Sequence, residues 1–319
     1  MNAAGEYQRR INEKLTRELG TALYGLLTNP AVIEIILNSD GEIWVERLGE
    51  PMKFFEKMPR SQADSMLRTV ASYVGVILND SHPILECEFP LDGSRFEALV
   101  PPIVSAPIFS IRKKAVQVFT LEDYVSQEIM TGTQRDAIHE AVTKKQNILI
   151  VGGTGSGKTT LTNAVIRDIA DSCPNDRMII LEDTCELQCT KKNTEFLRSN
   201  VKTSMTDLLK ATLRLRPDRI LVGEVRDGAA LALLKSWNTG HPGGVATIHA
   251  NSAYAGLIRL EQLIKEVTQS PMASLIGEAV DMVMYIEKHA GNRRIKEVMY
   301  VEGYDDNGYK TQFLGDDYV

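Results

Sequence analysis

A glycine-rich stretch that joins a strand-like run to a helical pattern limits the possible folds of this chain more than any other feature. Residues 152–159 read GGTGSGKT and satisfy the pattern G-x-x-x-x-G-K-[ST]. The apolar run NILIV enters this stretch, and the helical pattern TTLTNAVIRDIAD leaves it. Glycines let backbone N–H groups turn onto phosphate oxygens, and the N-terminus of the following helix adds a favourable dipole. The sequence therefore predicts a loop that binds the phosphates of a nucleoside triphosphate.

Each residue of this loop has an expected part in binding ATP and Mg²⁺. We expect Lys158 to reach the β- and γ-phosphates and the hydroxyl of Thr159 to coordinate the metal ion. The other expected ATP-binding residues are Gly152, Gly153, Thr154, Gly155, Ser156, Gly157 and Thr160. A chance match is disfavoured, because the glycines, the Lys-Thr pair and the strand–loop–helix context occur together.

A second apolar run, RILVG, ends at the acidic residue Glu224. We expect Glu224 to orient and polarise the water that attacks the γ-phosphate, which is the task of a positioned base in phosphoryl transfer. An acidic residue that holds the metal usually stands directly before such a glutamate, but that position is Gly223 here. The alternative interpretation is a solvated glutamate at the end of a strand.

The run MIILEDTCEL carries three carboxylates, Glu182, Asp183 and Glu186, where its strand-like part ends. Carboxylate oxygens suit a site for Mg²⁺ and its waters. We therefore expect Glu182 to hold the metal and to take part in catalysis. The alternative is that these side chains cap the next helix, which would be the better interpretation if the phosphate loop were missing.

The stretch TGHPGGVATIHAN, residues 239–251, contains two of the five histidines. A metal site would need a third ligand, and the spacing in the sequence brings no other histidine to this pair. The run VATIH follows the Glu224 strand by one helix, so His249 should emerge at the same end of the sheet as the nucleotide. We expect His249 to sense the γ-phosphate, and His241 to fix the turn or to meet a neighbouring subunit.

Patterns along the chain predict two domains of different class. Strand-like runs separated by turns, with helical stretches, indicate an α+β domain over residues 1–112. Residues 113–133 mix polar and apolar side chains and are expected to be an interdomain linker. From residue 134 onward short apolar runs alternate with helical patterns, which is typical of an α/β domain with a parallel sheet, here residues 134–319.

Composition limits the partners of this chain. A net charge of −6 argues against a surface built to hold nucleic acid, so direct nucleic-acid binding is not expected. No hydrophobic segment follows MNAAGEYQRR and the apolar runs are too short to span a bilayer, so membrane association is expected to be peripheral. The helical spacing of leucines from Leu15 to Leu26, with basic residues between them, fits a helix packed on its own domain. The alternative is a basic amphipathic helix on an anionic membrane.

Four stretches occur in one order over about 110 residues: VGGTGSGKTT, LEDTCE, RPDRILVGEVRD and TGHPGGVATIHAN. They resemble the Walker A, Asp box, atypical Walker B and His box of the type II/type IV secretion ATPase superfamily. Upstream, NPAVIEIILNSDGEIWVERLG and FPLDGSRFEALVPP are similar to the N-terminal domain of its conjugation-type members. The chain lacks the paired CxxC zinc module of some relatives, and Cys185 and Cys189 alone do not complete a zinc site.

The resemblance implies a homohexameric ring of two-domain protomers, each with a RecA-like P-loop ATPase domain and ATP between the domains. It implies that Arg95 and Arg112 approach the phosphates, a role that suits a guanidinium fork. Arg226 is a weaker candidate for an intersubunit or phosphate contact. The expected partners are inner-membrane components of a secretion or conjugation apparatus, and the expected location is the cytoplasmic face of the inner membrane.

Three functions compete on these observations. The leading hypothesis is an ATPase motor that energises type IV secretion or conjugative DNA transfer (mating-pair formation), with a pilus assembly ATPase of the tight-adherence type as its nearest alternative. A nucleic-acid translocase or helicase would be revealed by ATPase activity that single-stranded DNA stimulates. A nucleotide-binding scaffold would scarcely turn over ATP.

Overall fold

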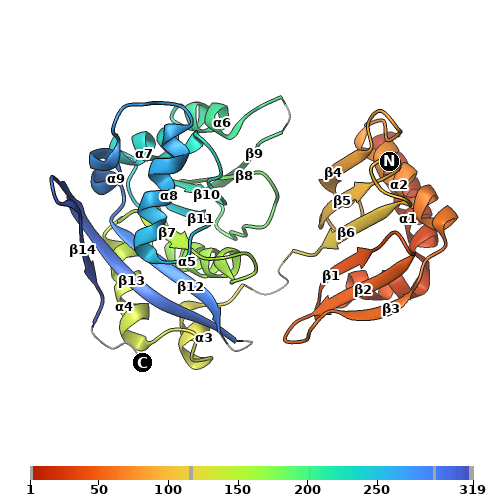
Figure 1. The fold of residues 1–319 in the computed structure, drawn as a ribbon, viewed down its shortest axis with the longest axis horizontal. Helices are drawn as coiled ribbons and strands as arrows, with labels where there is room; N and C mark the ends of the chain where they lie inside the picture. Colours follow the sequence, from red (N-terminus) through yellow and green to blue (C-terminus); the bar gives the residue numbers. More distant parts are fainter. Residues whose placement is uncertain (1–2, 115–117, 201, 290–291, 316–319) are drawn as a thin grey trace. The chain divides into compact units, whose positions relative to one another are not determined.

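The chain forms two compact units, which divide between residues 116 and 117 (Figure 1). The computed structural model describes residues 3–114, 118–200, 202–289 and 292–315. Each unit has a hydrophobic core of its own. The expected division into an α+β part and an α/β part is therefore confirmed in class.

The N-terminal unit is a six-stranded antiparallel sheet with two helices. The strand order is β3-β2-β1-β6-β5-β4. Its elements are α1 (Ala3–Thr28), β1 (Val32–Leu37), β2 (Glu42–Arg47), β3 (Lys53–Lys57), α2 (Arg60–Val74), β4 (Ile84–Glu88), β5 (Arg95–Leu99) and β6 (Ile108–Arg112). The hairpin that the sequence indicates around Asn38–Gly41 is the β1–β2 turn, where Gly41 has a φ of 82° that favours glycine.

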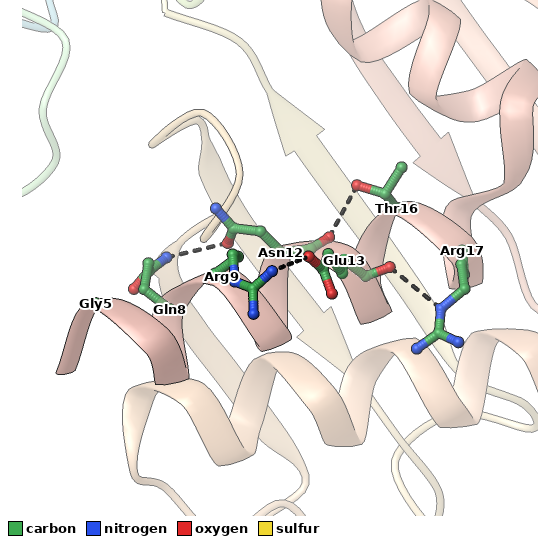
Figure 2. A pocket seen from close by; sticks show the side chains of 7 residues that line it. All are labelled: Gly5, Gln8, Arg9, Asn12, Glu13, Thr16 and Arg17. Carbon is green, nitrogen blue, oxygen red and sulfur yellow. Dashed lines mark hydrogen bonds and ion pairs between the residues drawn. The ribbon is translucent and has the colours of Figure 1, made fainter. Parts of the chain in front are cut away.

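Helix α1 turns its apolar side into its own domain. Leu15, Leu19, Leu23 and Leu26 are at most 5% exposed and belong to the N-terminal core. Each such leucine contributes about 1.5–3 kcal/mol through burial. The other side of the helix is polar, as Figure 2 shows: Arg9 and its neighbours line a shallow groove there. The apolar stripe thus packs internally, and none of the described helices is both long and apolar enough to cross a bilayer.

The C-terminal unit is built on an eight-stranded sheet, ordered β14-β13-β12-β7-β11-β10-β8-β9. The strands from β12 to β9 are parallel, and β13 and β14 add an antiparallel edge. Its strands are β7 (Ile148–Val151), β8 (Met178–Glu182), β9 (Thr194–Arg198), β10 (Arg219–Val222), β11 (Val245–Ile248), β12 (Met282–His289), β13 (Asn292–Asp305) and β14 (Gly308–Phe313). Four of these, β7, β8, β10 and β11, are the strands that the apolar runs predict.

Helices cover both faces of this sheet. They are α3 (Leu121–Ser126), α4 (Gly132–Thr143), α5 (Lys158–Ser172), α6 (Met205–Thr212), α7 (Ala229–Asn238), α8 (Ala253–Lys265) and α9 (Ala273–Ala279). One core joins α3, α4 and α5 to side chains such as Ile148 and Ile150; the other joins α6 to α9 to Leu149 and Val151. Successive residues of β7 therefore face opposite layers, as a strand requires.

The stretch expected to be a linker, residues 113–133, is helical in part. It contains α3, which begins with a capping box between Thr120 and Asp123. Leu121 and Tyr124 are 3% exposed and lie in the core beside α4 and α5. Burial of these two side chains places α3 in the C-terminal unit, which begins at residue 117 rather than at 134.

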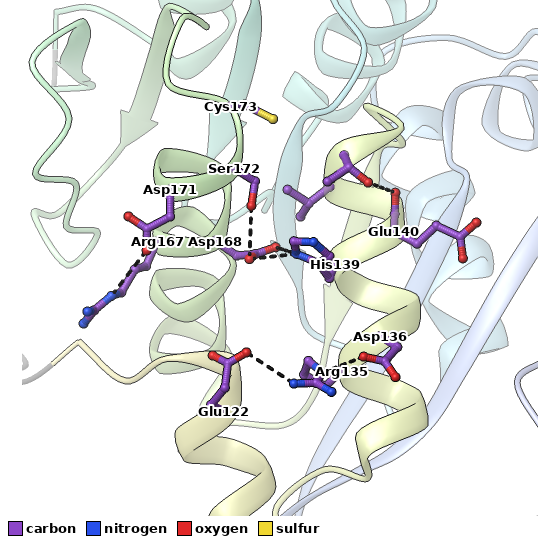
Figure 3. A network of polar contacts seen from close by, with 12 residues as sticks. Glu122, Arg135, Asp136, His139, Glu140, Arg167, Asp168, Asp171, Ser172 and Cys173 are labelled. Atoms are coloured by element: carbon purple, nitrogen blue, oxygen red, sulfur yellow. Dashed lines mark hydrogen bonds and ion pairs between the residues drawn. The ribbon is translucent and has the colours of Figure 1, made fainter.

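A polar network ties α3 and α4 to α5 on the outer surface of this layer (Figure 3). Arg135 reaches Glu122 of α3 at 3.4 Å. His139 Nδ1 lies 3.0 Å from Asp168 of α5. Exposed pairs of this kind contribute about 0–1 kcal/mol each. These contacts help to hold α5, the helix that follows the glycine-rich loop.

Candidate active site

Four parallel strands end side by side at one edge of the C-terminal sheet, and the residues predicted to bind ATP or to act in catalysis in this domain emerge there. The register pairs Val222 of β10 with Leu181 of β8, and Ile248 of β11 with Val151 of β7. The residues that follow these strand ends must therefore lie next to one another. This edge matches the place where open α/β sheets bind their ligands.

The glycine-rich loop leaves β7 and leads directly into α5. A Cβ on Gly152 would lie 2.4 Å from the carbonyl oxygen of Ile286 and 2.5 Å from Ser156 Oγ, so no other residue fits without movement. Gly157, at the N-cap of α5, has a φ of 102°, which a side chain would strain. The loop therefore keeps its amides and the N-terminus of α5 open to phosphate oxygens.

Lys158 lies inside this loop. Its Nζ donates hydrogen bonds to the carbonyl oxygens of Gly152 at 2.9 Å and Gly153 at 3.1 Å. The side chain is buried, and Nζ also lies 3.1 Å from Nδ1 of His249. The ammonium group thus stands at the centre of the loop and touches the end of β11.

His249 connects Lys158 to Glu224. An ammonium group only donates, so Nδ1 of His249 accepts from Lys158 and the ring proton lies on Nε2. Nε2 is 2.7 Å from Glu224 Oε1 and donates to it. Burial and the Lys158 charge lower the pKa of His249, although Glu224 works in the opposite direction. The ring is therefore neutral near pH 7, and it accepts one hydrogen bond from the loop lysine and donates another to the carboxylate.

Glu224 has a second partner on its other side. Its Oε2 lies 2.7 Å from Nη2 of Arg226, and Nη1 of Arg226 is 3.9 Å from Asp183. Both oxygens of the carboxylate are thus engaged, one by a neutral imidazole and one by a guanidinium. The sequence suggested only a weak role for Arg226, because spacing alone does not show that it turns back onto Glu224.

The glycine before Glu224 makes room for a carboxylate from the neighbouring strand. A Cβ on Gly223 would lie 3.3 Å from Glu182 Cγ. Glu182 is 3% exposed, and its Oε1 accepts from the amides of Glu186 at 2.9 Å and Leu187 at 2.7 Å. Burial raises the pKa of Glu182 to about 7. A side chain at position 223 would therefore press on Glu182, which the glycine leaves room for.

The residues around Thr159 fit a Mg²⁺ ion. Thr159 Oγ1 donates to Glu186 Oε2 at 3.1 Å, and the buried Oε2 of Glu182 has no hydrogen-bond partner among the described residues. A hydroxyl and carboxylate oxygens are the ligands that Mg²⁺ takes together with waters and phosphates. The sequence names Glu182 and Glu186 among the carboxylates that suit Mg²⁺, but the contact of Glu186 with Thr159 depends on the loop after β8 and does not follow from the sequence. Within the described ranges no three His, Cys, Asp or Glu side chains cluster closely enough to hold a metal by themselves.

Arg95 and Arg112 belong to the N-terminal unit. They are direct cross-strand partners on β5 and β6, so both side chains emerge on one face of that sheet. Arg95 Nη2 lies 3.5 Å from Glu86 Oε1. The two arginines are thus neighbours in the N-terminal unit. The other predicted site residues, which are those of the glycine-rich loop and of the strand ends, lie together in the C-terminal unit.

The two histidines of TGHPGGVATIHAN lie at opposite ends of β11. His241 precedes the strand, and His249 follows it. The glycines between them are fixed by packing: a Cβ on Gly243 would lie 2.6 Å from Nη1 of Arg219, and one on Gly244 would lie 2.0 Å from Nε1 of Trp237. A shared metal site is therefore excluded by position, and the Pro-Gly-Gly turn serves the packing at the far end of the sheet.

Comparison with known proteins gives one consistent answer. A family model described as "Type II/IV secretion system protein" matches residues 19–301. The chain is 49% identical over 303 residues to "Conjugal transfer protein TrbB" of Rhizobium radiobacter, which covers 95% of this chain and 94% of the relative. It is 28% identical to "Type IV secretion system protein VirB11" of Bartonella quintana (strain Toulouse), over 86% and 89% of the two chains.

A solved structure agrees in fold. The X-ray structure of the Legionella pneumophila ATPase DotB matches with a TM-score of 0.65, covering 93% of this chain and 82% of that one, at 18% identity. The matched family model spans most of the chain, and the strand-end site described above lies within it. The chain therefore belongs to the type II/IV secretion system protein family and is an ATPase.

Proposed function

We propose that this chain is the ATPase motor of a conjugative type IV secretion apparatus. The high identity to a conjugal transfer protein over nearly the whole chain supports this assignment. The observation that carries the mechanism is the chain of contacts from Lys158 through His249 to Glu224. It joins the phosphate-binding loop to the carboxylate best placed to act on water.

In the proposed reaction, water attacks the γ-phosphate in line with the leaving ADP. Lys158 and the loop amides hold the phosphates, which take over the contacts that Lys158 Nζ now makes with loop carbonyls. Glu224 orients the attacking water and polarises its O–H bond, and the carboxylate accepts the proton as the new P–O bond forms. His249 stays neutral and is hydrogen-bonded to both Lys158 and Glu224. A movement of Lys158 towards the γ-phosphate would therefore change the contact of His249 with Glu224, which is how we expect His249 to sense the γ-phosphate.

Thr159, Glu182 and Glu186 are the residues proposed to hold Mg²⁺. The ion, when bound, neutralises charge on the β- and γ-phosphates. The unpartnered oxygen of Glu182 and the Thr159–Glu186 contact support this assignment. Because burial, and to a smaller extent the charge of Glu186, raise the pKa of Glu182, a cation beside it would favour the ionised carboxylate again.

We further propose that the protein works as a homo-oligomeric ring, with six protomers, at the cytoplasmic face of the inner membrane. In this ring, Arg95 and Arg112 would neutralise charge on the transferring phosphoryl group. Their side-by-side position on one sheet face gives two guanidinium groups that act together. Membrane components of the apparatus would be its partners, with any membrane contact peripheral.

Conjugation itself tests this function. A plasmid whose copy of this chain carries Lys158→Ala should transfer no better than a plasmid that lacks the chain. The variant removes the ammonium group that lies against Gly152 and Gly153 in the loop and is proposed to hold the phosphates. Lys265→Ala, on the exposed side of α8, serves as the matched control and should transfer like wild type. Both variants are checked by immunoblot for equal protein levels. Normal transfer with Lys158→Ala, or normal transfer without the chain, would refute the proposal.

A further inference from the structure

A second cavity borders the candidate active site. It has a volume of about 230 Å³ and is lined by Glu224, Val225, Arg226, Ile248, His249 and Arg259. None of the lining residues comes from the glycine-rich loop. Because Glu224 and His249 also form the contact chain to Lys158, these two side chains stand between the loop and the cavity.

The loop and the cavity lie towards different layers of the domain. Helix α5, which the loop starts, packs in the core on one face of the sheet, through side chains such as Leu161. Helix α8, which carries Arg259, packs in the core on the other face, through side chains such as Leu257. Glu224 and His249 are hydrogen-bonded at 2.7 Å, so a group that moves from the α5 side of the strand ends towards the α8 side must first break that contact.

The charges of the cavity favour an anion. Arg226 and Arg259 bring two guanidinium groups, while Glu224 brings one carboxylate and His249 is neutral. Within the described part of the chain Arg259 makes no ion pair; its Nη1 donates to the amide oxygen of Gln262 at 3.1 Å. Guanidinium groups bind phosphate oxygens in forked pairs of hydrogen bonds. The cavity thus offers one guanidinium group, that of Arg259, which forms no ion pair with any described residue although Glu224 lines the same cavity.

The size of the cavity selects a small anion. A water molecule takes up about 30 Å³ of liquid, so the space holds a tetrahedral oxyanion with several waters. It is smaller than the roughly 300 Å³ at which sites for drug-sized ligands begin. The space suits inorganic phosphate, which is the oxyanion that the proposed reaction releases beside Glu224.

We propose that this cavity is the exit site for the inorganic phosphate product. The γ-phosphoryl group is freed next to Glu224 and His249, while ADP stays held by the loop on the α5 side. Phosphate then leaves through the cavity, where Arg259 receives it. The inference rests on the proposed role of Glu224 in hydrolysis, but phosphate binding by the cavity itself needs no turnover.

Equilibrium binding of inorganic phosphate to protein saturated with ADP and Mg²⁺ tests the site. Arg259→Gln should raise the dissociation constant for phosphate by about tenfold, which corresponds to the loss of one charge-assisted contact of about 1.4 kcal/mol. Arg259→Lys, which keeps the charge but not the fork, should fall between the two. Lys265→Gln, also on α8, should bind phosphate like wild type. The affinity for ADP and the melting temperature, measured in the same samples, should not change.

Three results would overturn the inference. The first is an unchanged phosphate affinity in Arg259→Gln, and the second is no phosphate binding to the ADP-loaded wild type. The third is an equal loss of ADP and phosphate affinity in Arg259→Gln, which would place Arg259 in the nucleotide site. If the proposed hydrolysis were wrong, wild type would fail to turn over ATP, whereas the phosphate-binding result would stand by itself.

Discussion

Glu224→Gln should lower kcat by roughly 10²- to 10⁴-fold and leave the affinity for ATP within a few-fold of wild type. The amide keeps the size of the side chain, and its oxygen can still accept from Nε2 of His249, now 2.7 Å from the carboxylate. It carries no charge, however, so it cannot polarise water or keep its ion pair with Arg226. Turnover is measured as phosphate release, and affinity as equilibrium binding of labelled ATP to the same preparation.

Glu195→Gln is the matched control for this variant, because Glu195 is exposed on the edge strand β9. It should leave both kcat and ATP affinity unchanged. A Glu224→Gln protein with near wild-type turnover would remove Glu224 from the water-positioning role. A variant that also lost ATP binding would show instead that Glu224 shapes the whole site.

Asp176→Ala should lower the free energy of unfolding by about 3–5 kcal/mol, because it leaves a fully buried charge without its partner. Arg219 is 0% exposed, and its Nε donates to Asp176 Oδ2 at 2.7 Å. Its other nitrogens bond the carbonyl oxygens of Gly243 at 3.1 Å and Val142 at 2.9 Å, so the pair also holds the Pro-Gly-Gly turn. Urea unfolding at pH 7, followed by circular dichroism, measures the difference.

The effect of Asp176 has a defined pH dependence. Burial disfavours its charged form, but hydrogen bonds from Arg219 and Lys145 outweigh burial and lower its pKa. A lowered folded-state pKa stabilises the protein above the ordinary range of aspartate, and that stabilisation is lost as the pH falls through the lowered value. The variant and wild type should therefore converge in acid. The control Asp171→Ala, at an exposed ion pair with Arg167, should cost less than about 1 kcal/mol at any pH. An equal loss in both variants would contradict this account of Arg219.

Sequence patterns predict the part of the fold that follows from short-range chemistry. Strands β7, β8, β10 and β11 are short apolar runs buried on both faces, and the loop before α5 has a fixed pattern of glycines. Helix α3 was missed because six residues give too little periodicity. Its capping box, Thr120 with Asp123, was the signal that could have located it.

Sequence patterns do not show which segments that are far apart in the chain come into contact. In the sequence, Gly223 stands where a metal-binding carboxylate is usual, so that carboxylate is missing from the pattern. The register of β8 beside β10 brings Glu182 next to Gly223 in the folded chain. In the same way, Arg259 is far from Glu224 in the chain and reaches the same cavity only because α8 starts just after β11. Register and helix placement depend on the packed core, so residue spacing alone cannot give them.

A double-mutant cycle on kcat measures whether His249 couples the phosphate loop to Glu224. His249→Ala and Glu224→Gln should each lower kcat, and the double variant should be no slower than Glu224→Gln alone, with a coupling free energy of roughly 0.5–3 kcal/mol. That result follows if His249 acts through Glu224, as the contacts of its Nδ1 and Nε2 indicate. Losses that simply multiply in the double variant would show two independent residues and would contradict the account.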